Sequence, residues 1–127
     1  MAELVYKDLS YKIIGILFNV FNELGYGYQE KYYQRAIALA LDKEKLNYIR
    51  EREIKLNFQN NPIGKYFLDF IIENKIVLEV KVTNQFNSQD IKQVLGYLKG
   101  SGLQLGILAI ITKEGIKYKR LLNIRTN

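Results

Sequence analysis

The chain has 127 residues and contains no cysteine and no histidine. These absences exclude disulfide frameworks, zinc sites built from thiolates or imidazoles, and catalysis by serine–histidine or cysteine–histidine pairs. The 19 Lys and Arg outnumber the 13 Asp and Glu, and the resulting net charge of +6 favours a polyanionic partner such as nucleic acid. Any catalysis must therefore use carboxylates, lysine, hydroxyl groups or a hard metal ion.

The length suits a single domain over residues 1–127. The first residues lack the basic start, apolar run and small-residue cleavage site of a signal peptide. The most apolar run, residues 103–111, is too short for a membrane span. We therefore expect a cytoplasmic protein with no membrane partner.

Two helices are expected first, at residues 7–24 and from about residue 29 to 45, on either side of a turn rich in glycine and tyrosine. Each helix has an apolar stripe at the spacing of a buried helix face. The stripe residues are Ile14, Leu17, Phe18 and Phe21 in the first helix and Tyr33, Ile37, Ala40 and Leu41 in the second.

Strands are expected in the middle of the chain. Over residues 48–58 apolar residues recur at every second position, with Ile54, Leu56 and Phe58 on one side. A dense cluster of turn residues at 59–64 ends this strand. Two further strands are expected at residues 65–72 and 76–83.

The last third alternates between helix and strand. Asn87 or Ser88 is the expected N-cap of a helix that ends near Lys99, with strands at 103–111 and 116–124. The order ααβββαββ indicates an α/β fold with helices packed on a mixed sheet, and its strand–helix–strand unit favours a right-handed crossover between parallel strands. The core stripe expected in this helix is Ile91, Val94, Leu95 and Leu98.

One hairpin in the middle of the chain carries the candidate site. A loop at residues 73–75 would pair Ile72 with Ile76, and counting inward then places Asp69 opposite Glu79. Paired residues point to the same face of a sheet with Cβ atoms about 4.5–5.5 Å apart. The two acids are therefore expected side by side.

Lys81 is expected on the same face, opposite Phe67, while the reverse face is entirely apolar. Like charges directly opposite each other destabilise a sheet, and a divalent cation between the acids would remove the repulsion. The alternative is that Lys81 neutralises one acid while the other reaches solvent. The apolar face comprises Tyr66, Leu68, Phe70 and Ile72 against Ile76, Leu78, Val80 and Val82.

Context distinguishes this site from similar short motifs. An acid-x-Lys tripeptide occurs four times, but only Glu79-Val80-Lys81 lies inside an apolar strand with a second acid opposite. The other three are Glu53-Ile54-Lys55, Glu73-Asn74-Lys75 and Asp90-Ile91-Lys92.

Further motifs accompany this tripeptide in a fixed order. They are Gly27-Tyr28-Gln29-Glu30-Lys31-Tyr32-Tyr33, Glu51-Arg52-Glu53, Gly64 to Phe70, Leu78 to Lys81, Gln93 to Lys99 and Gly102 to Gly106. In this combination the chain resembles PD-(D/E)xK superfamily nucleases, and within them the small bacterial and archaeal GxxExxY proteins. The resemblance implies a restriction-endonuclease-like fold and covers nearly the whole chain.

The resemblance also implies a role for each matched position. Asp69 and Glu79 would hold Mg²⁺, or Mn²⁺ in its place, and Lys81 would orient or help deprotonate the attacking water. Glu30 would be a further ligand, directly or through water, or a partner of Lys81. The other matched positions are the Val80 carbonyl as a further ligand, and Gln93 and Tyr97 lining the site from the following helix.

Some of these residues also have ordinary structural explanations. Gln93 and Tyr97 are four residues apart on one helix face and would otherwise form a surface hydrogen bond and a half-buried ring. Glu30 in the first turn of a helix is favoured by the helix dipole alone. Two positions depart from the family: Leu68 replaces a frequent proline, and Asp90 replaces a common histidine. Asp90 would then be a further metal or water ligand, or part of the helix N-cap.

The expected activity is hydrolysis of phosphodiester bonds in nucleic acid, DNA above all, by a metal-activated water. The alternatives are a non-catalytic module that binds nucleic acid or protein, and a structural subunit with a vestigial metal site. A homodimer would suit a chain this short. The residues expected to contact the nucleic-acid backbone are Arg35, Lys55, Lys65, Lys99, Lys113, Lys117, Lys119 and Arg120.

Overall fold

The computed structural model of the protein describes residues 5–123. Its element order is ααβββαββ, which confirms the order expected from the sequence. The strand expected at 116–124 is present as far as Leu122, Asn123 is not part of it, and residue 124 lies outside the described residues. The elements are α1 (Lys7–Leu24), α2 (Glu30–Lys43), β1 (Tyr48–Phe58), β2 (Asn61–Ile72), β3 (Ile76–Val82), α3 (Ser88–Ser101), β4 (Leu105–Thr112) and β5 (Gly115–Leu122).

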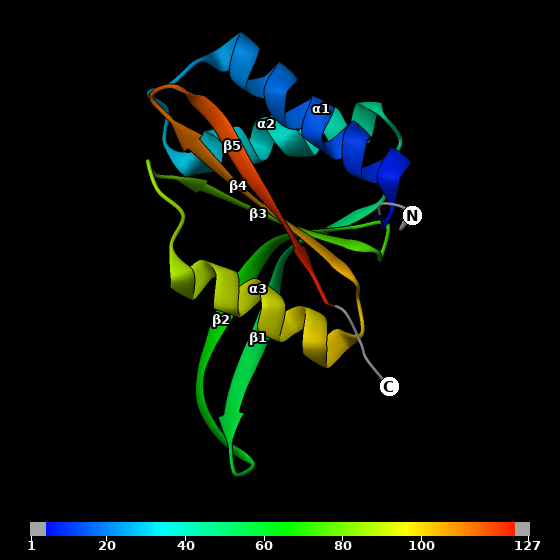
Figure 1. Ribbon diagram of the computed structural model, residues 1–127, viewed down its shortest axis with the longest axis vertical. Helices are drawn as coiled ribbons and strands as arrows, with labels where there is room; N and C mark the ends of the chain where they lie inside the picture. The colour runs from blue at the N-terminus through cyan, green and yellow to red at the C-terminus, as the bar shows by residue number, and fades with distance from the viewer. Residues whose placement is uncertain (1–4, 124–127) are drawn as a thin grey trace.

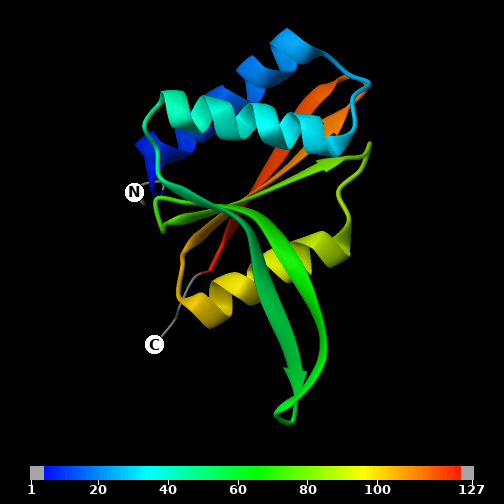
Figure 2. The same cartoon turned by 180° about the vertical axis from the view of Figure 1, so that it is seen from behind.

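The five strands form one mixed sheet in the order β1-β2-β3-β4-β5. β3 and β4 are parallel, as the strand–helix–strand pattern predicted, and the other neighbouring strands are antiparallel. Helices α1 and α2 lie on one face of the sheet and α3 lies on the other (Figures 1 and 2). This is the restriction-endonuclease-like α/β arrangement. None of the described helices is long and apolar enough to cross a membrane.

Each face of the sheet has its own apolar core. The larger core packs α1 and α2 against Phe70, Leu78 and their neighbours, and the smaller one packs α3 against Val77. The predicted helix stripes are partly wrong, because Phe18 and Leu95 are exposed. The buried residues of these two helices are Ser10, Ile13, Ile16 and Leu17 in α1 and Val94 and Leu98 in α3.

The β1–β2 hairpin projects well beyond α3 as a two-stranded arm (Figure 1). Its turn needs only Gln59 and Asn60, whose φ angles of 49° and 66° fit a two-residue hairpin turn. The prediction of a longer turn at 59–64 is therefore wrong, because β2 already begins at Asn61. No helix covers the far part of the arm, so Leu56 and Phe58 are exposed rather than buried.

Both strands of the arm kink at Glu51 and Asp69. Glu51 has a φ of 53°, and neither residue belongs to the regular β1–β2 ladder that continues on both sides of them. The kink moves Tyr66 and Leu68 to the α3 face of the sheet, while Phe70 stays in the larger core. The prediction that all three share one buried face is therefore wrong.

Helix α3, which carries Gln93 and Tyr97, sits directly on β4. A Cβ atom at Gly106 would lie 2.5 Å from Cγ1 of Val94, so only glycine allows this close approach. The Asn87 side chain caps the helix by accepting a hydrogen bond from the Gln89 N–H at 2.7 Å, which confirms the predicted N-cap.

Candidate active site

The candidate site lies where β2 separates from β3. Their ladder runs from the loop only as far as Phe70 and Leu78, so it stops one residue before Asp69 and Glu79. Beyond this point, N–H groups on β2 and β3 lose their partners in the other strand, and a buried N–H without a partner is costly. Asp69 and Glu79 are thus adjacent, although they are not the regular cross-strand pair that the sequence predicted.

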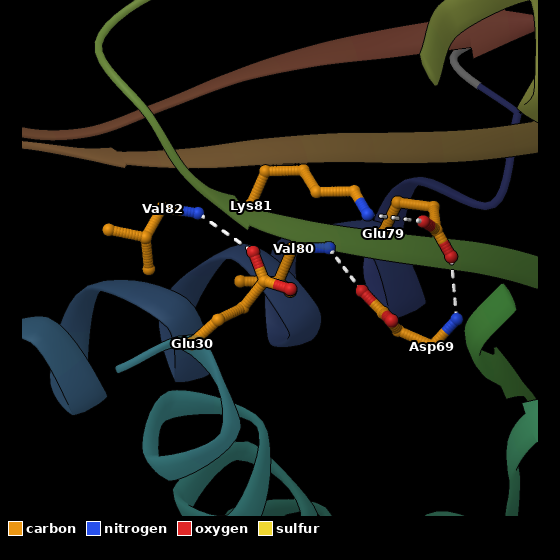
Figure 3. A network of polar contacts seen from close by, with 6 residues as sticks. All are labelled: Glu30, Asp69, Glu79, Val80, Lys81 and Val82. Atoms are coloured by element: carbon orange, nitrogen blue, oxygen red, sulfur yellow. Dashed lines mark hydrogen bonds and ion pairs between the residues drawn. The ribbon is translucent and has the colours of Figure 1, made fainter. Parts of the chain in front are cut away.

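Three carboxylates take the place of the missing strand pairing (Figure 3). Asp69 Oδ2 accepts a hydrogen bond from the Val80 N–H at 2.7 Å, and Glu30 Oε1 accepts one from the Val82 N–H at 3.0 Å. In the opposite direction, Glu79 Oε1 accepts a hydrogen bond from the Asp69 N–H at 2.5 Å. Residues from α2, β2 and β3 therefore meet along one edge of β3.

The acid pair is held away from water. Glu79 is only 4% exposed. Burial, together with the neighbouring Asp69 carboxylate, raises the pKa of Glu79 to about 8, against the opposing effects of the Asp69 N–H and Lys81. Burial also raises the pKa of Asp69 to about 6. The site therefore strongly disfavours two unpaired negative charges.

Lys81 provides the positive charge beside this pair. Its Nζ lies 3.9 Å from Glu79 Oε2. Burial lowers the pKa of the Lys81 ammonium, but Glu79, Asp69 and more distant acids outweigh that effect and raise the pKa overall. Lys81 is consequently a permanent cation at the site.

Two residues outside the expected acid–lysine set also act on the site. Asp90, in the first turn of α3, is close enough to raise the pKa values of Glu79 and Lys81. Arg50 on β1 pairs with Phe70, and its guanidinium carbon lies 5.3 Å from the centre of that ring. The Arg50 charge lowers the pKa of Asp69, and its buried Nε has no hydrogen-bond partner among the described residues.

Arg50 was not predicted from the sequence. Its proximity to Asp69 follows only from the β1–β2 register. That register pairs Tyr48 with Ile72 and so places Arg50 next to the β1 position that faces Asp69. Without that register, Arg50 is one basic residue among many.

Gln93 and Tyr97 lie on α3 near the root of the arm, and both are partly buried. The backbone carbonyl of Gln93 accepts a 3.3 Å hydrogen bond from the Tyr66 hydroxyl. Burial, followed by the charges of Glu79 and Tyr97, raises the pKa of Tyr66. Tyr97 also lines a shallow groove with the β1 residues Arg52, Glu53, Ile54 and Lys55.

The basic residues expected to contact nucleic acid fall on separate surfaces. Lys55 and Lys65 pair with each other on the arm. Arg35 lies on α2, and Lys99 lies near the end of α3. The last group belongs to β5 and the preceding turn, at the opposite edge of the sheet from the arm: Lys113, Lys117, Lys119 and Arg120.

Some members of the β5 group have structural partners. Lys117 Nζ lies 4.0 Å from Glu114 Oε2. Lys119 Nζ lies over the Phe86 ring, 4.9 Å from its centre. Arg120 donates a 2.7 Å hydrogen bond to the Val5 carbonyl.

The donor set fits a hard divalent cation. Within residues 5–123 no group of three or more acidic side chains is close enough together to hold a metal ion. Mg²⁺ does not need three, because it is commonly held by one or two carboxylates and keeps several waters. Asp69, which is partly buried, and Glu79, which is buried, supply two adjacent carboxylates with raised pKa values, and a bound cation would remove their repulsion.

A family model described as the PD-(D/E)XK nuclease superfamily matches residues 7–121. The chain belongs to the PD-(D/E)XK nuclease superfamily. Members of this superfamily are generally nucleases and typically use divalent metal ions.

Solved structures also match this superfamily member. One, titled "Crystal structure of SSO0001", is 17% identical, covers 94% of this chain and 80% of its own, and gives a TM-score of 0.48. No curated protein matches the chain.

Proposed function

We propose that this protein is a metal-dependent nuclease of the GxxExxY group that hydrolyses phosphodiester bonds in nucleic acid, with DNA as the main substrate. The observation that carries the proposal is the adjacent pair of carboxylates, partly buried Asp69 and buried Glu79, with the Lys81 ammonium 3.9 Å from Glu79. Such a pair destabilises the fold unless a positive charge balances it. A purely structural role for the two acids would therefore lower the stability of the fold.

Each residue of the site has a task in this proposal. Asp69 and Glu79 would hold Mg²⁺ or Mn²⁺, with Glu30 and the Val80 carbonyl as additional oxygen donors. When bound, the ion lowers the pKa of water and offsets charge on the phosphate. Lys81 orients the attacking water and stabilises the negative charge that develops on the phosphate oxygens. Gln93 and Tyr97 position the water or substrate from α3.

The net charge of +6 supports a polyanionic substrate. Lysine and arginine contacts to phosphate supply affinity but carry no sequence information. We therefore propose that Lys55, Lys65 and Arg35, which lie on α2 and the arm, hold the nucleic-acid backbone.

The test is a cleavage assay on labelled DNA and RNA with Mg²⁺, Mn²⁺ or EDTA. We expect metal-dependent cleavage by the wild type and none by Asp69→Asn or Glu79→Gln, because each variant removes one carboxylate. Glu114→Gln is the matched control, since it removes an exposed acid in the β4–β5 turn. It should cleave like the wild type.

Two results would contradict the proposal. Equal cleavage by the wild type and the two site variants would point to a contaminating nuclease. Binding that weakens with salt, without cleavage in any metal, would instead favour the non-catalytic binding module.

A further inference from the structure

The β1–β2 arm has one face that no helix covers. Ile54 and Tyr66, which are cross-strand partners, turn toward α3 and belong to the smaller core. Residues alternate between faces along a strand, so the neighbouring pairs turn the opposite way. In Figure 2 the arm passes in front of α3, with this outer face toward the viewer. The outer face carries two pairs, Glu53 with Phe67 and Lys55 with Lys65.

The outer face carries two positive charges directly opposite each other, with the acid Glu53 one cross-strand pair further along. Lys55 and Lys65 are directly opposite each other, and like charges at such positions destabilise a sheet. Neither lysine forms an ion pair with any acid in the described part of the chain. A bound polyanion would remove this repulsion, so the charge of the face is complementary to phosphate groups.

The same face also presents an aromatic ring. Phe67 is 49% exposed, and Lys65 Nζ lies 5.8 Å from the centre of its ring. Phe67 and Lys65 lie two and four residues before Asp69 on β2, so the ring and the Lys55–Lys65 pair lie between the acid pair and the tip of the arm. A cationic strand with an exposed ring is the combination that holds unpaired bases, because phosphates contact the charges and bases stack on the ring.

A second surface that combines cations with exposed rings flanks Glu30 at the start of α2. Tyr28 and Tyr32 are exposed and pack edge to face, with ring centres 6.5 Å apart. Lys31 and Arg35 lie over the Tyr32 ring, at 5.2 and 5.7 Å from its centre. Both surfaces therefore adjoin residues of the site, one next to Asp69 on β2 and the other next to Glu30 on α2, and both combine cations with exposed rings.

We propose that the protein acts on nucleic acid with an unpaired strand, which the outer face of the arm holds through Lys55, Lys65 and Phe67. The inference rests on the proposed nuclease function and specifies its substrate class. Bases of a continuous duplex are stacked on their neighbours and leave no face free for Phe67 or the tyrosines. A single strand offers both phosphates and open base faces.

The experiment measures binding without cleavage, by fluorescence anisotropy in EDTA. The probes are labelled oligothymidylate, labelled oligouridylate and a blunt duplex, each titrated at several salt concentrations. The variants are Phe67→Ala, Lys55→Gln with Lys65→Gln, and Tyr32→Ala. Because all four residues are exposed, the variants should fold, which circular dichroism checks.

Matched controls come from α1. Tyr11→Ala removes another exposed ring, and Lys7→Gln with Lys12→Gln removes the same amount of charge. Sedimentation equilibrium of the wild type and Phe67→Ala reports whether the ring lies between two copies of the chain.

We expect the wild type to bind the single strands more tightly than the duplex. Phe67→Ala and Tyr32→Ala should each weaken single-strand binding roughly tenfold or more, with little effect on the duplex. The double lysine variant should reduce the slope of log affinity against log salt by about 1.4, which corresponds to two phosphate contacts. The α1 controls should bind like the wild type.

Three results would overturn the inference: tighter binding of the duplex, wild-type affinity in Phe67→Ala, or a wild-type dimer that Phe67→Ala dissociates. Parallel cleavage assays with Mg²⁺ or Mn²⁺ separate this inference from the nuclease proposal. If the variants lose binding as expected but the wild type never cleaves, only the nuclease proposal fails. If the wild type cleaves and the arm variants bind and cleave normally, only the arm inference fails.

Discussion

The two halves of the β2–β3 hairpin join the same two strands in different ways, one through apolar residues in a regular ladder and the other through carboxylate side chains. Near the loop, Phe70 pairs with Leu78 in a regular ladder, and both side chains are fully buried. Past Phe70, the ladder ends and the carboxylates of Asp69 and Glu79 bind backbone N–H groups instead. The apolar half stabilises the fold. The charged half destabilises it, and the apolar half compensates for that loss of folding free energy.

This difference explains how a small domain can carry a buried acid pair. β3 is fixed on its other side by a continuous parallel ladder to β4, from Ile76 to Val82. At the edge that faces the kink, the N–H groups of β3 can therefore donate hydrogen bonds to side chains while β3 keeps its strand conformation. Changes in the charged half should mainly alter activity, and changes in the apolar half should mainly alter stability.

The largest effect is expected in the charged half, from Lys81→Met. Methionine keeps most of the side-chain length but removes the cation beside Glu79. We expect kcat for cleavage to fall by about 10²–10³-fold, as for the loss of one group that stabilises transition-state charge. Single-turnover cleavage measures this effect, with Lys12→Met on α1 as the control. Wild-type turnover in Lys81→Met would remove Lys81 from the mechanism.

In the apolar half, Leu78→Ala should destabilise the fold by about 3 kcal/mol, because it leaves a cavity next to Phe70. Urea denaturation should show a lower midpoint with an unchanged slope. Leu39→Ala is the control, since Leu39 is exposed on α2 and should change stability by less than about 0.5 kcal/mol. Similar losses in both variants would contradict the packing described for β3.

The charged half should make stability depend on pH in the metal-free protein. Burial raises the pKa of Glu79 from 4.5 to about 8, so the folded state keeps a proton that the unfolded chain releases within this range. Raising the pH through this window therefore destabilises the fold. We expect the wild type to lose more stability than Glu79→Gln across the window, by roughly 1.4 kcal/mol for each unit by which folding raises the pKa of Glu79. Parallel pH profiles in the two proteins would contradict the burial of this acid.

The smallest effect tests how α3 sits on the apolar half. Gly106 pairs with Val77, and an alanine side chain at Gly106 would collide with Val94. We expect Gly106→Ala to cost about 1 kcal/mol through overpacking. Combining it with Val94→Ala should cost less than the sum of the single changes, because the smaller side chain leaves room for the new methyl group. Additive losses in chemical denaturation would show that the two positions do not touch.

Local patterns were sufficient to predict the fold. Apolar spacing predicted each helix and strand, and the three-residue loop after Ile72 set the hairpin register correctly as far as Phe70 and Leu78. The errors came from tertiary context. Phe58 continues the period-two pattern of a half-buried strand, yet it is 60% exposed because nothing packs on the end of the arm.

Local sequence patterns predicted the candidate site less completely than they predicted the fold. Strand counting brought Asp69, Glu79 and Lys81 together, but a uniform hairpin cannot contain the kink that frees the Val80 N–H for Asp69. Arg50 escaped notice because its position depends on the pairing of β1 with β2, which the overestimated turn at 59–64 concealed.

The most direct test of the central claim is thermal unfolding with and without Mn²⁺ at a pH above about 8, where Asp69 and Glu79 both carry charge. A cation that binds only the folded state raises the free energy of unfolding, by about 2.7 kcal/mol at one hundred times its dissociation constant. We expect Mn²⁺ to raise the Tm of the wild type and to leave Asp69→Asn and Glu79→Gln unchanged. An equal rise in all three proteins would contradict a metal site at the acid pair.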